Sequence, residues 1–150
     1  MRGLVQRVAW AEVEVDGAVV GRIEQGLLVY VGIGTSDTAR QASWLAEKIA
    51  NLRIFADAGG KLNLSVRDLE GAGVLAISNF TLLADARKGR RPAFSAAAGF
   101  EQAKPIHQAF LDALAGQGVP TQTGVFGAMM AIRSEAAGPV NVIVDTPPAE

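Results

Sequence analysis

The pattern of apolar and polar residues predicts a series of β-strands in the N-terminal part of the chain. Leu4–Val8 is a short apolar run, and apolar and acidic residues alternate over Trp10–Val15, as in a strand with one buried face. Asp16–Gly17 is a strong hairpin signal, because both central residues of a type I′ turn need a positive φ. The return strand is predicted at Val19–Ile23. Leu27–Ile33 is apolar almost throughout, which predicts a central strand covered on both faces.

Two later stretches have the spacing of amphipathic helices. The first follows Ser36 and Asp37, either of which can cap a helix. The second spans Glu101–Ala115, with Pro105 expected in the first turn and the single histidine, His107, on its apolar stripe. The buried stripe of the first helix is expected to consist of Ala42, Leu45, Ala46 and Ile49.

Shorter stretches, of which Lys61–Val66 alternates polar and apolar residues and could be irregular, predict the remaining strands. They are Leu52–Phe55, Lys61–Val66, Val74–Ile77, Val119–Val125, Met129–Arg133 and Val140–Val144. About eight strands and two helices, with hairpins early and late, are typical of an α+β domain. We therefore expect one domain over residues 1–150, built on a strongly curved, barrel-like and largely antiparallel sheet.

The composition narrows the classes of function. The 150 residues are 49% hydrophobic and 19% charged, which argues against disorder, and the net charge of −1 says nothing about partners. The absence of cysteine excludes thiol nucleophiles and thiolate metal sites. One histidine and no spaced carboxylate cluster predict no metal or other cofactor. Without a signal peptide or a long apolar run, we expect a cytoplasmic protein with no membrane partner.

The strongest charge cluster contains Arg87, Lys88, Arg90 and Arg91, with no acid among them. Four cations in five positions repel one another unless an anion neutralises them. The phosphates of a nucleic acid would do so, and a cluster without aromatic residues suits contact with the nucleic-acid backbone. A solvated charged loop is the alternative.

Ser78, Asn79 and Thr81 surround Phe80 at the end of the strand predicted at Val74–Ile77. Neither hydroxyl has an obvious general base, so no catalytic triad can be assembled. The backbone N–H groups of Phe80 and Thr81 are candidates to stabilise an oxyanion. The alternative is that these hydroxyls only shape a turn. His107, on an apolar stripe, is expected to be a packed histidine.

Gly138–Pro139 lies between two strand-like runs. A cis bond here would point carbonyl groups in an unusual direction, although a trans turn is the commoner form of such a pair.

Taken together, these segments resemble the D-aminoacyl-tRNA deacylase family. The match covers nearly the whole chain, and the segments follow one another in the family's order and spacing. They are Met1–Arg2, Val5–Val8, Ala46–Phe55, Lys61–Val66, Ser78–Leu82 (SNFTL), Arg87–Phe94 (RKGRRPAF), Phe126–Met130 (FGAMM) and Gly138–Asn141 (GPVN).

The resemblance implies the family fold and a homodimer, in which a cis Gly138–Pro139 of one subunit enters the other subunit's pocket and rejects L-amino acids. The implied reaction is hydrolysis of the ester between tRNA and a D-amino acid, or glycine mischarged on tRNA(Ala). Catalysis is then expected at Ser78, Phe80 and Thr81. Substrate is expected to contact Asn79, Met130, Gly138 and Pro139, and tRNA to contact Arg87, Lys88, Arg90 and Arg91.

The chain departs from the family pattern at several positions. Asn79 stands in place of Gln, Asn141 in place of Thr, Met129 in place of Asp, and Ala136–Ala137 in place of Asn-Asp. These changes leave open a catalytically weakened tRNA-binding module or a deacylase with shifted amino-acid specificity. A small-molecule esterase with a serine or threonine nucleophile is a further alternative.

Overall fold

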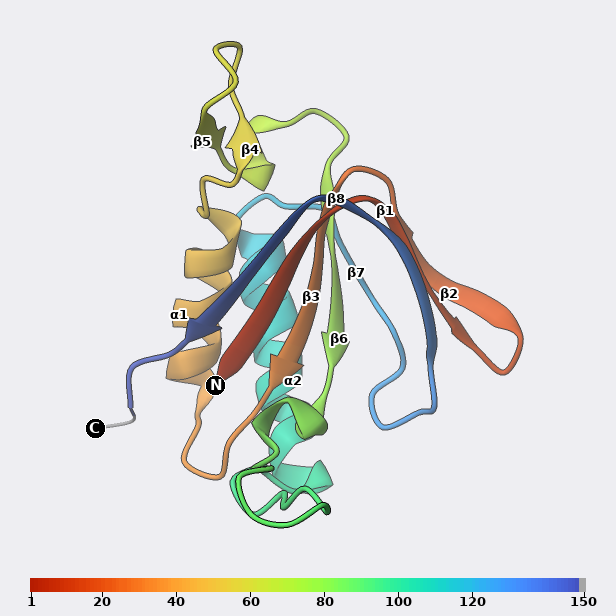
Figure 1. Ribbon diagram of the computed structural model, residues 1–150, viewed down its shortest axis with the longest axis vertical. Helices are drawn as coiled ribbons and strands as arrows, with labels where there is room; N and C mark the ends of the chain where they lie inside the picture. Colours follow the sequence, from red (N-terminus) through yellow and green to blue (C-terminus); the bar gives the residue numbers. More distant parts are fainter. Residues whose placement is uncertain (149–150) are drawn as a thin grey trace.

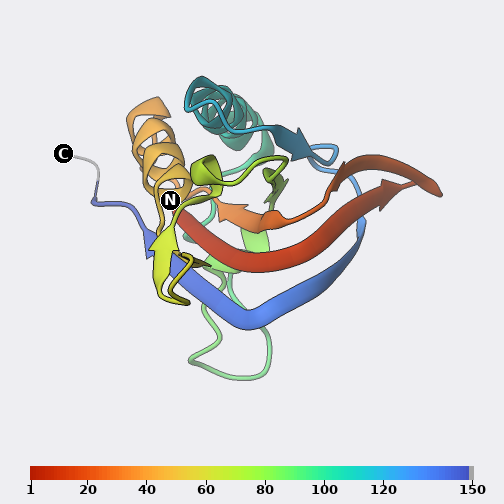
Figure 2. The same ribbon diagram turned by 90° about the horizontal axis from the view of Figure 1, so that it is seen from above.

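The computed structural model describes residues 1–148. It shows a curved sheet of six strands with both long helices packed on one side (Figures 1 and 2). The helices are α1 (Ala39–Ala50) and α2 (Phe100–Gly116), with short 3₁₀ turns η1 (Val66–Asp68) and η2 (Phe80–Leu83). The strands are β1 (Arg2–Val15), β2 (Ala18–Ile23), β3 (Gly26–Gly32), β4 (Phe55–Ala56), β5 (Leu62–Leu64), β6 (Gly73–Ser78), β7 (Thr121–Thr123) and β8 (Ala131–Asp145). No helix in this described part of the chain is both long and apolar enough to cross a membrane.

The predicted α+β, barrel-like fold is confirmed, with one correction to the sheet. Strand β1 pairs antiparallel with β2, β3 and β8, but β6 runs parallel to both β3 and β7. The sheet is therefore mixed. Parallel neighbours need a long crossover, and α1 with the β4–β5 hairpin provides one between β3 and β6.

Strand β8 is one continuous strand, whereas the sequence predicted two runs. It lies beside the whole of β1, and Met129 precedes it in a loop (Figure 1). Gln6 pairs with Asn141 and Val8 with Ala136, so Arg7 alone faces the four residues 137–140. Extra residues on one strand make a bulge and bend the strand. The Gly138–Pro139 bond, which is cis, lies in this bulge.

Two apolar clusters hold the sheet, and β3 contributes to both. Leu27 and Val29 face α1 and α2, while Leu28 faces the concave side with Val13 and Leu75. All five side chains are fully buried. The prediction of a central strand covered on both faces is confirmed. The predicted stripe of α1 is confirmed as well, since all four of its residues are fully buried: Ala42, Leu45, Ala46 and Ile49.

Both helices begin differently from the prediction. Thr38 caps α1, because its hydroxyl accepts from the Arg40 N–H while its own N–H donates to the Gln41 side chain. Asp37 is instead buried, and it accepts from the Gly34 N–H and the Met1 amine. Helix α2 begins earlier, at Phe100, which places Pro105 in the second turn. Strands β4, β5 and β7 are shorter than the stretches for which they were predicted.

Candidate active site

Strand β6 ends at Ser78, beside Val31 of β3, and the chain turns there into η2. A cavity of about 610 Å³ opens at this end of the sheet. Ser78, Asn79 and Phe80 form one side of it, and the start of α2 and the loop between β7 and β8 form the other. Met130, from that loop, also lines the cavity, so four of the predicted site residues lie together.

The far wall of the cavity is largely aromatic. Phe100 and Phe126 pack edge to face with ring centroids 5.2 Å apart. The Phe100 ring lies so close to Gly127 that a Cβ added there would come within 2.5 Å of it. Met129 stands at the rim with 92% of its surface exposed. The wall suits an apolar side chain or the face of a base.

Backbone N–H donors are available beside Ser78. The Asn79 N–H donates to the Val31 carbonyl over 2.8 Å, but the N–H groups of Phe80 and Thr81 donate to no acceptor among residues 1–148. The Thr81 hydroxyl donates to Asn79 Oδ1 over 2.5 Å, which leaves the Asn79 amide NH₂ free to donate. Thr81 itself is outside the cavity lining.

No ionisable side chain is among the described residues that line this cavity. His107 lies behind the wall, with its ring centroid 5.5 Å from that of Phe126, and it is only 4% exposed. Its Nδ1 atom is buried without a hydrogen-bond partner. Burial lowers the pKa of His107 to about 4. The prediction of a packed histidine is confirmed, and the cavity must work without a side-chain proton carrier of its own.

The buried His107 predicts a loss of stability in acid. The unfolded chain takes up a proton near pH 6.5, and the folded chain does so only near pH 4. Between these values the unfolded state holds more protons, so the free energy of unfolding falls as the pH falls, by about 3 kcal/mol in total. Urea melts at pH 7 and pH 4.5 should show this loss in the parent and not in His107→Leu. Equal pH dependence in the two proteins would contradict the assignment.

The basic segment forms an exposed loop whose base is tied to the rim of the cavity. Asp85 and Ala93 exchange two backbone hydrogen bonds of 2.8 and 2.9 Å. Phe94 follows and packs edge to face on Phe80, with centroids 5.2 Å apart. The loop therefore begins and ends next to the candidate N–H donors.

One of the four cations of this loop has an acidic partner within the chain. Asp85 binds Arg87 through two hydrogen bonds of 2.9 and 2.6 Å. This pairing raises the pKa of Arg87 and lowers the pKa of Asp85. Lys88, Arg90 and Arg91 form no ion pair within residues 1–148 and are exposed. Three cations thus remain available.

Gly138 and Pro139 are not part of the cavity in the same chain. They lie opposite Arg7, which pairs with Leu27 near the start of β3, whereas Ser78 pairs with Val31 near its end. Four strand residues span about 13 Å. Arg7 fixes the bulge, because it donates to the Ala137 carbonyl over 2.9 Å and to the Ile54 carbonyl over 2.8 Å.

Sequence reasoning missed several residues of this region. Phe100 was placed outside the predicted helix, and nothing in the sequence brings it to Phe126. Lys104, whose Nζ lies 5.7 Å from the centre of the Phe100 ring, adds a cation near the cavity. Arg7 belongs to a segment shared with the family, which was the one available signal for it. Within the described residues, no group of three or more His, Asp or Glu side chains is placed to hold a metal ion.

Comparison with known proteins gives consistent results. A family model described as D-Tyr-tRNA(Tyr) deacylase matches residues 4–145. A D-aminoacyl-tRNA deacylase of Geobacter sulfurreducens is 49% identical over 97% of this chain and 95% of its own. That of Chloroflexus aurantiacus is 52% identical over 97% and 91%. A solved structure titled c-Myc DNA Unwinding Element Binding Protein is similar with a TM-score of 0.90 and 35% identity, over 98% and 99% of the two chains.

Proposed function

The chain belongs to the D-Tyr-tRNA(Tyr) deacylase family, as a hydrolase that deacylates D-aminoacyl-tRNA, and we propose that the reaction takes place in the cavity beside Ser78. One observation carries the location: the unpaired backbone N–H groups of Phe80, in the lining, and of the next residue, Thr81, lie beside an apolar pocket whose described lining has no ionisable side chain. An aminoacyl ester is already activated, so such a site can cleave it by orientation and charge stabilisation alone.

In this proposal the N–H groups of Phe80 and Thr81 receive the oxyanion that develops on the ester carbonyl. A single preorganised donor of this kind contributes about 3 kcal/mol to the stability of the transition state. Ser78 shapes the pocket, the free amide of Asn79 binds the terminal adenosine, and Met130 covers the aminoacyl group. The 2′-hydroxyl of the ribose is the nearest proton donor and acceptor that the substrate itself brings.

We further propose that a second copy of the chain completes the site. Within one chain Gly138 and Pro139 lie far from the cavity, so they reach such a pocket by entering that of a partner. Strand β8 supports this arrangement, because one of its edges is unpaired among residues 1–148 and Ile143 on it is 64% exposed. The carbonyl groups of the entering motif would then exclude the side chain of an L-amino acid.

Glycine has no side chain to exclude, so glycyl-tRNA(Ala) is proposed as a second substrate. Because tRNA is charged in the cytoplasm, this is also the compartment that we propose for the enzyme. The acceptor stem would leave the pocket along the basic loop, where Lys88, Arg90 and Arg91 meet its phosphates.

Removing the three free cations of the loop should weaken binding of tRNA. For the triple variant Lys88→Ala, Arg90→Ala, Arg91→Ala we expect KM for D-tyrosyl-tRNA to rise roughly 30-fold at low salt, with little change in kcat. The slope of log KM against log salt should fall by roughly two to three. Arg87→Ala is the matched control, because Asp85 already pairs with Arg87 and the effect should be smaller. If Arg87→Ala raised KM as much as Lys88→Ala, Arg90→Ala or Arg91→Ala alone, the proposed contacts would be contradicted.

The direct test compares D-tyrosyl-, L-tyrosyl- and glycyl-tRNA(Ala) as substrates at low salt. Rapid release of D-tyrosine and glycine, with L-tyrosyl-tRNA spared, is expected. Equal cleavage of the D and L esters would refute selection by chirality, and binding without cleavage would indicate a tRNA-binding module. Thr81→Ala distinguishes the nucleophile alternative. It should keep activity within about tenfold, because the backbone N–H remains, whereas loss of a nucleophile costs several orders of magnitude.

A further inference from the structure

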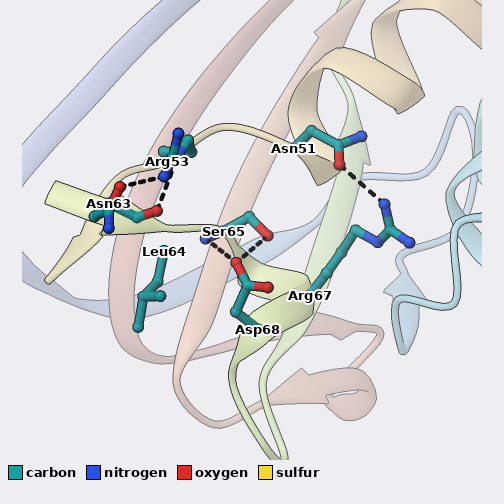
Figure 3. Close-up of a pocket in the computed structure, with 7 residues that line it drawn as sticks. All are labelled: Asn51, Arg53, Asn63, Leu64, Ser65, Arg67 and Asp68. Carbon is teal, nitrogen blue, oxygen red and sulfur yellow. Dashed lines mark hydrogen bonds between the residues drawn. The ribbon is translucent and has the colours of Figure 1, made fainter. Parts of the chain in front are cut away.

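A second cavity, of about 660 Å³, lies at the opposite end of the molecule from η2, where α1 ends and the β4–β5 hairpin begins (Figures 1 and 3). Its lining is polar and includes two arginines, Arg53 and Arg67, two asparagines, Asn51 and Asn63, and one carboxylate, Asp68. Nothing in the proposed reaction uses these side chains.

Both guanidinium groups are held by uncharged partners. Arg53 donates from Nε to the Asn63 carbonyl over 2.7 Å and from Nη2 to Asn63 Oδ1 (Figure 3). Arg67 donates from Nη1 to Asn51 Oδ1 over 2.9 Å, and the Asn51 amide is itself fixed by the Glu47 carbonyl. Amide partners orient a guanidinium without neutralising its charge. Neither arginine forms an ion pair among residues 1–148, so both keep charge and N–H donors to offer.

The lining of the cavity keeps a net positive charge even when the carboxylate of Asp68 is counted. Its Oδ2 accepts hydrogen bonds from the Ser65 N–H and hydroxyl, over 2.7 and 2.8 Å. These bonds, helped by the charges of Arg67 and Arg53, lower the pKa of Asp68, so the group is ionised at neutral pH. It is bound to Ser65 and not to either arginine. Two cations and one anion remain, a balance that favours a further anion.

We propose that this cavity binds a phosphate group of the tRNA substrate. Two oriented guanidinium groups match the fork geometry of phosphate oxygens. The described residues that line the cavity include no aromatic ring, so it offers no stacking surface for a base and suits the sugar-phosphate backbone.

The position of the cavity fits this role, on the premise of the proposed function. Arg7 ties the Ala137 carbonyl to the Ile54 carbonyl, so the segment that carries Arg53 is fixed to the bulge containing Gly138 and Pro139. If that bulge enters a partner's pocket, Arg53 comes close to the same pocket, and Arg67 lies in the same cavity as Arg53. An acceptor strand whose 3′ end lies in that pocket would then have phosphates within reach of both arginines.

The test measures deacylation of D-tyrosyl-tRNA and of 3′-D-tyrosyl-adenosine, an ester without phosphates, by Arg67→Gln and Arg53→Gln. We expect the ratio of kcat/KM on tRNA to that on the adenosine ester to fall about tenfold in each variant. The slope of log KM for tRNA against log salt should fall by about one per arginine. Arg22→Gln, which removes one positive charge from the distant β2, is the matched control and should keep both values.

An unchanged ratio in both variants overturns the proposal. A second result would also overturn it: inorganic phosphate raises the melting temperature of the parent but not of Arg67→Gln, while KM for tRNA is the same in both proteins. The cavity would then bind a small anion and not the tRNA. Because Arg53 also holds the hairpin, melting temperatures check that each variant folds. The salt dependence of the Kd for uncharged tRNA, measured for the parent and for each variant, tests the arginines even if the parent cleaves no D-aminoacyl ester.

Discussion

Gly138→Ala is expected to lower kcat/KM for D-tyrosyl-tRNA by about 100-fold, because a displacement of about 1 Å in a positioning group has an effect of this size. Gly138 has a φ of +134°, which side chains with a Cβ rarely adopt. An added Cβ would also lie 2.9 Å from the backbone nitrogen of Val140 and 3.0 Å from Arg7 Nη2. The bulge must therefore move, and the hold of Arg7 on it must loosen.

Single-turnover deacylation of D- and L-tyrosyl-tRNA measures this effect together with the loss of discrimination. Gly116→Ala is the control, since Gly116 is the last residue of α2 and a Cβ there meets nothing within 4 Å. Its activity should match that of the parent. If Gly138→Ala cleaved the D ester at the parent's rate and still spared the L ester, Gly138 would have no part in the site.

Gly26→Ala is expected to remove more than about 4 kcal/mol from the free energy of unfolding, which is a large part of the usual 5–15 kcal/mol. Gly26 begins β3 and pairs with Gly73 at the start of β6. A Cβ on Gly26 would overlap the carbonyl oxygen of Gly73, which is backbone and cannot rotate away. The two central strands would be forced apart where β3 and β6 begin.

Urea denaturation followed by circular dichroism measures this loss, and Gly116→Ala again serves as the control. That control should be neutral or up to about 1 kcal/mol more stable, because alanine is the better helix former. A Gly26→Ala protein that unfolds at the parent's urea concentration would show that the strands can shift to admit a methyl group.

Local patterns in the sequence predicted much of the fold. The alternation in β1, the continuous apolar run of β3 and the stripe of α1 all record which side chains are buried, and burial is decided by the nearest layers of the sheet and helices. The mixed direction of the sheet was not predictable in this way. It depends on where the crossover through α1 and the β4–β5 hairpin returns the chain, which no single segment encodes.

Contacts between distant segments also decided the course of β8 and the start of α1, and local sequence patterns do not show such contacts. The bulge of residues 137–140 lies between two apolar runs, so its sequence looks like a break although β1 pairs on both sides of it. Thr38 was passed over as the cap because Ser36 and Asp37 are equally good caps in isolation. Asp37 is instead taken up by the Gly34 N–H and the Met1 amine, and the second of these contacts is distant in the chain.

For the candidate site, the sequence indicated Ser78, Asn79, Phe80 and Met130, which lie together around the cavity. Two contacts of the basic segment were not foreseen, because its charges and rings were considered as isolated segments. Asp85 stands two residues before Arg87 and neutralises it, and Phe94 packs on Phe80 although the basic loop separates them. Arg67 carried no signal and Arg53 only that of a segment shared with the family, since each is an ordinary surface cation until the fold brings the two together.

The cavity is lined by strand ends, by the start of α2 and by the loop before β8, and not all of its lining belongs to the apolar clusters that hold the sheet. Asn79 and Met129, two of the positions where this chain differs from its family's pattern, belong to neither apolar cluster. Substitutions at these two positions are therefore expected to cost little stability, so the lining of the cavity can change while the scaffold stays constant. The residues that hold the fold and these two residues of the cavity lining are thus different sets, which can change independently.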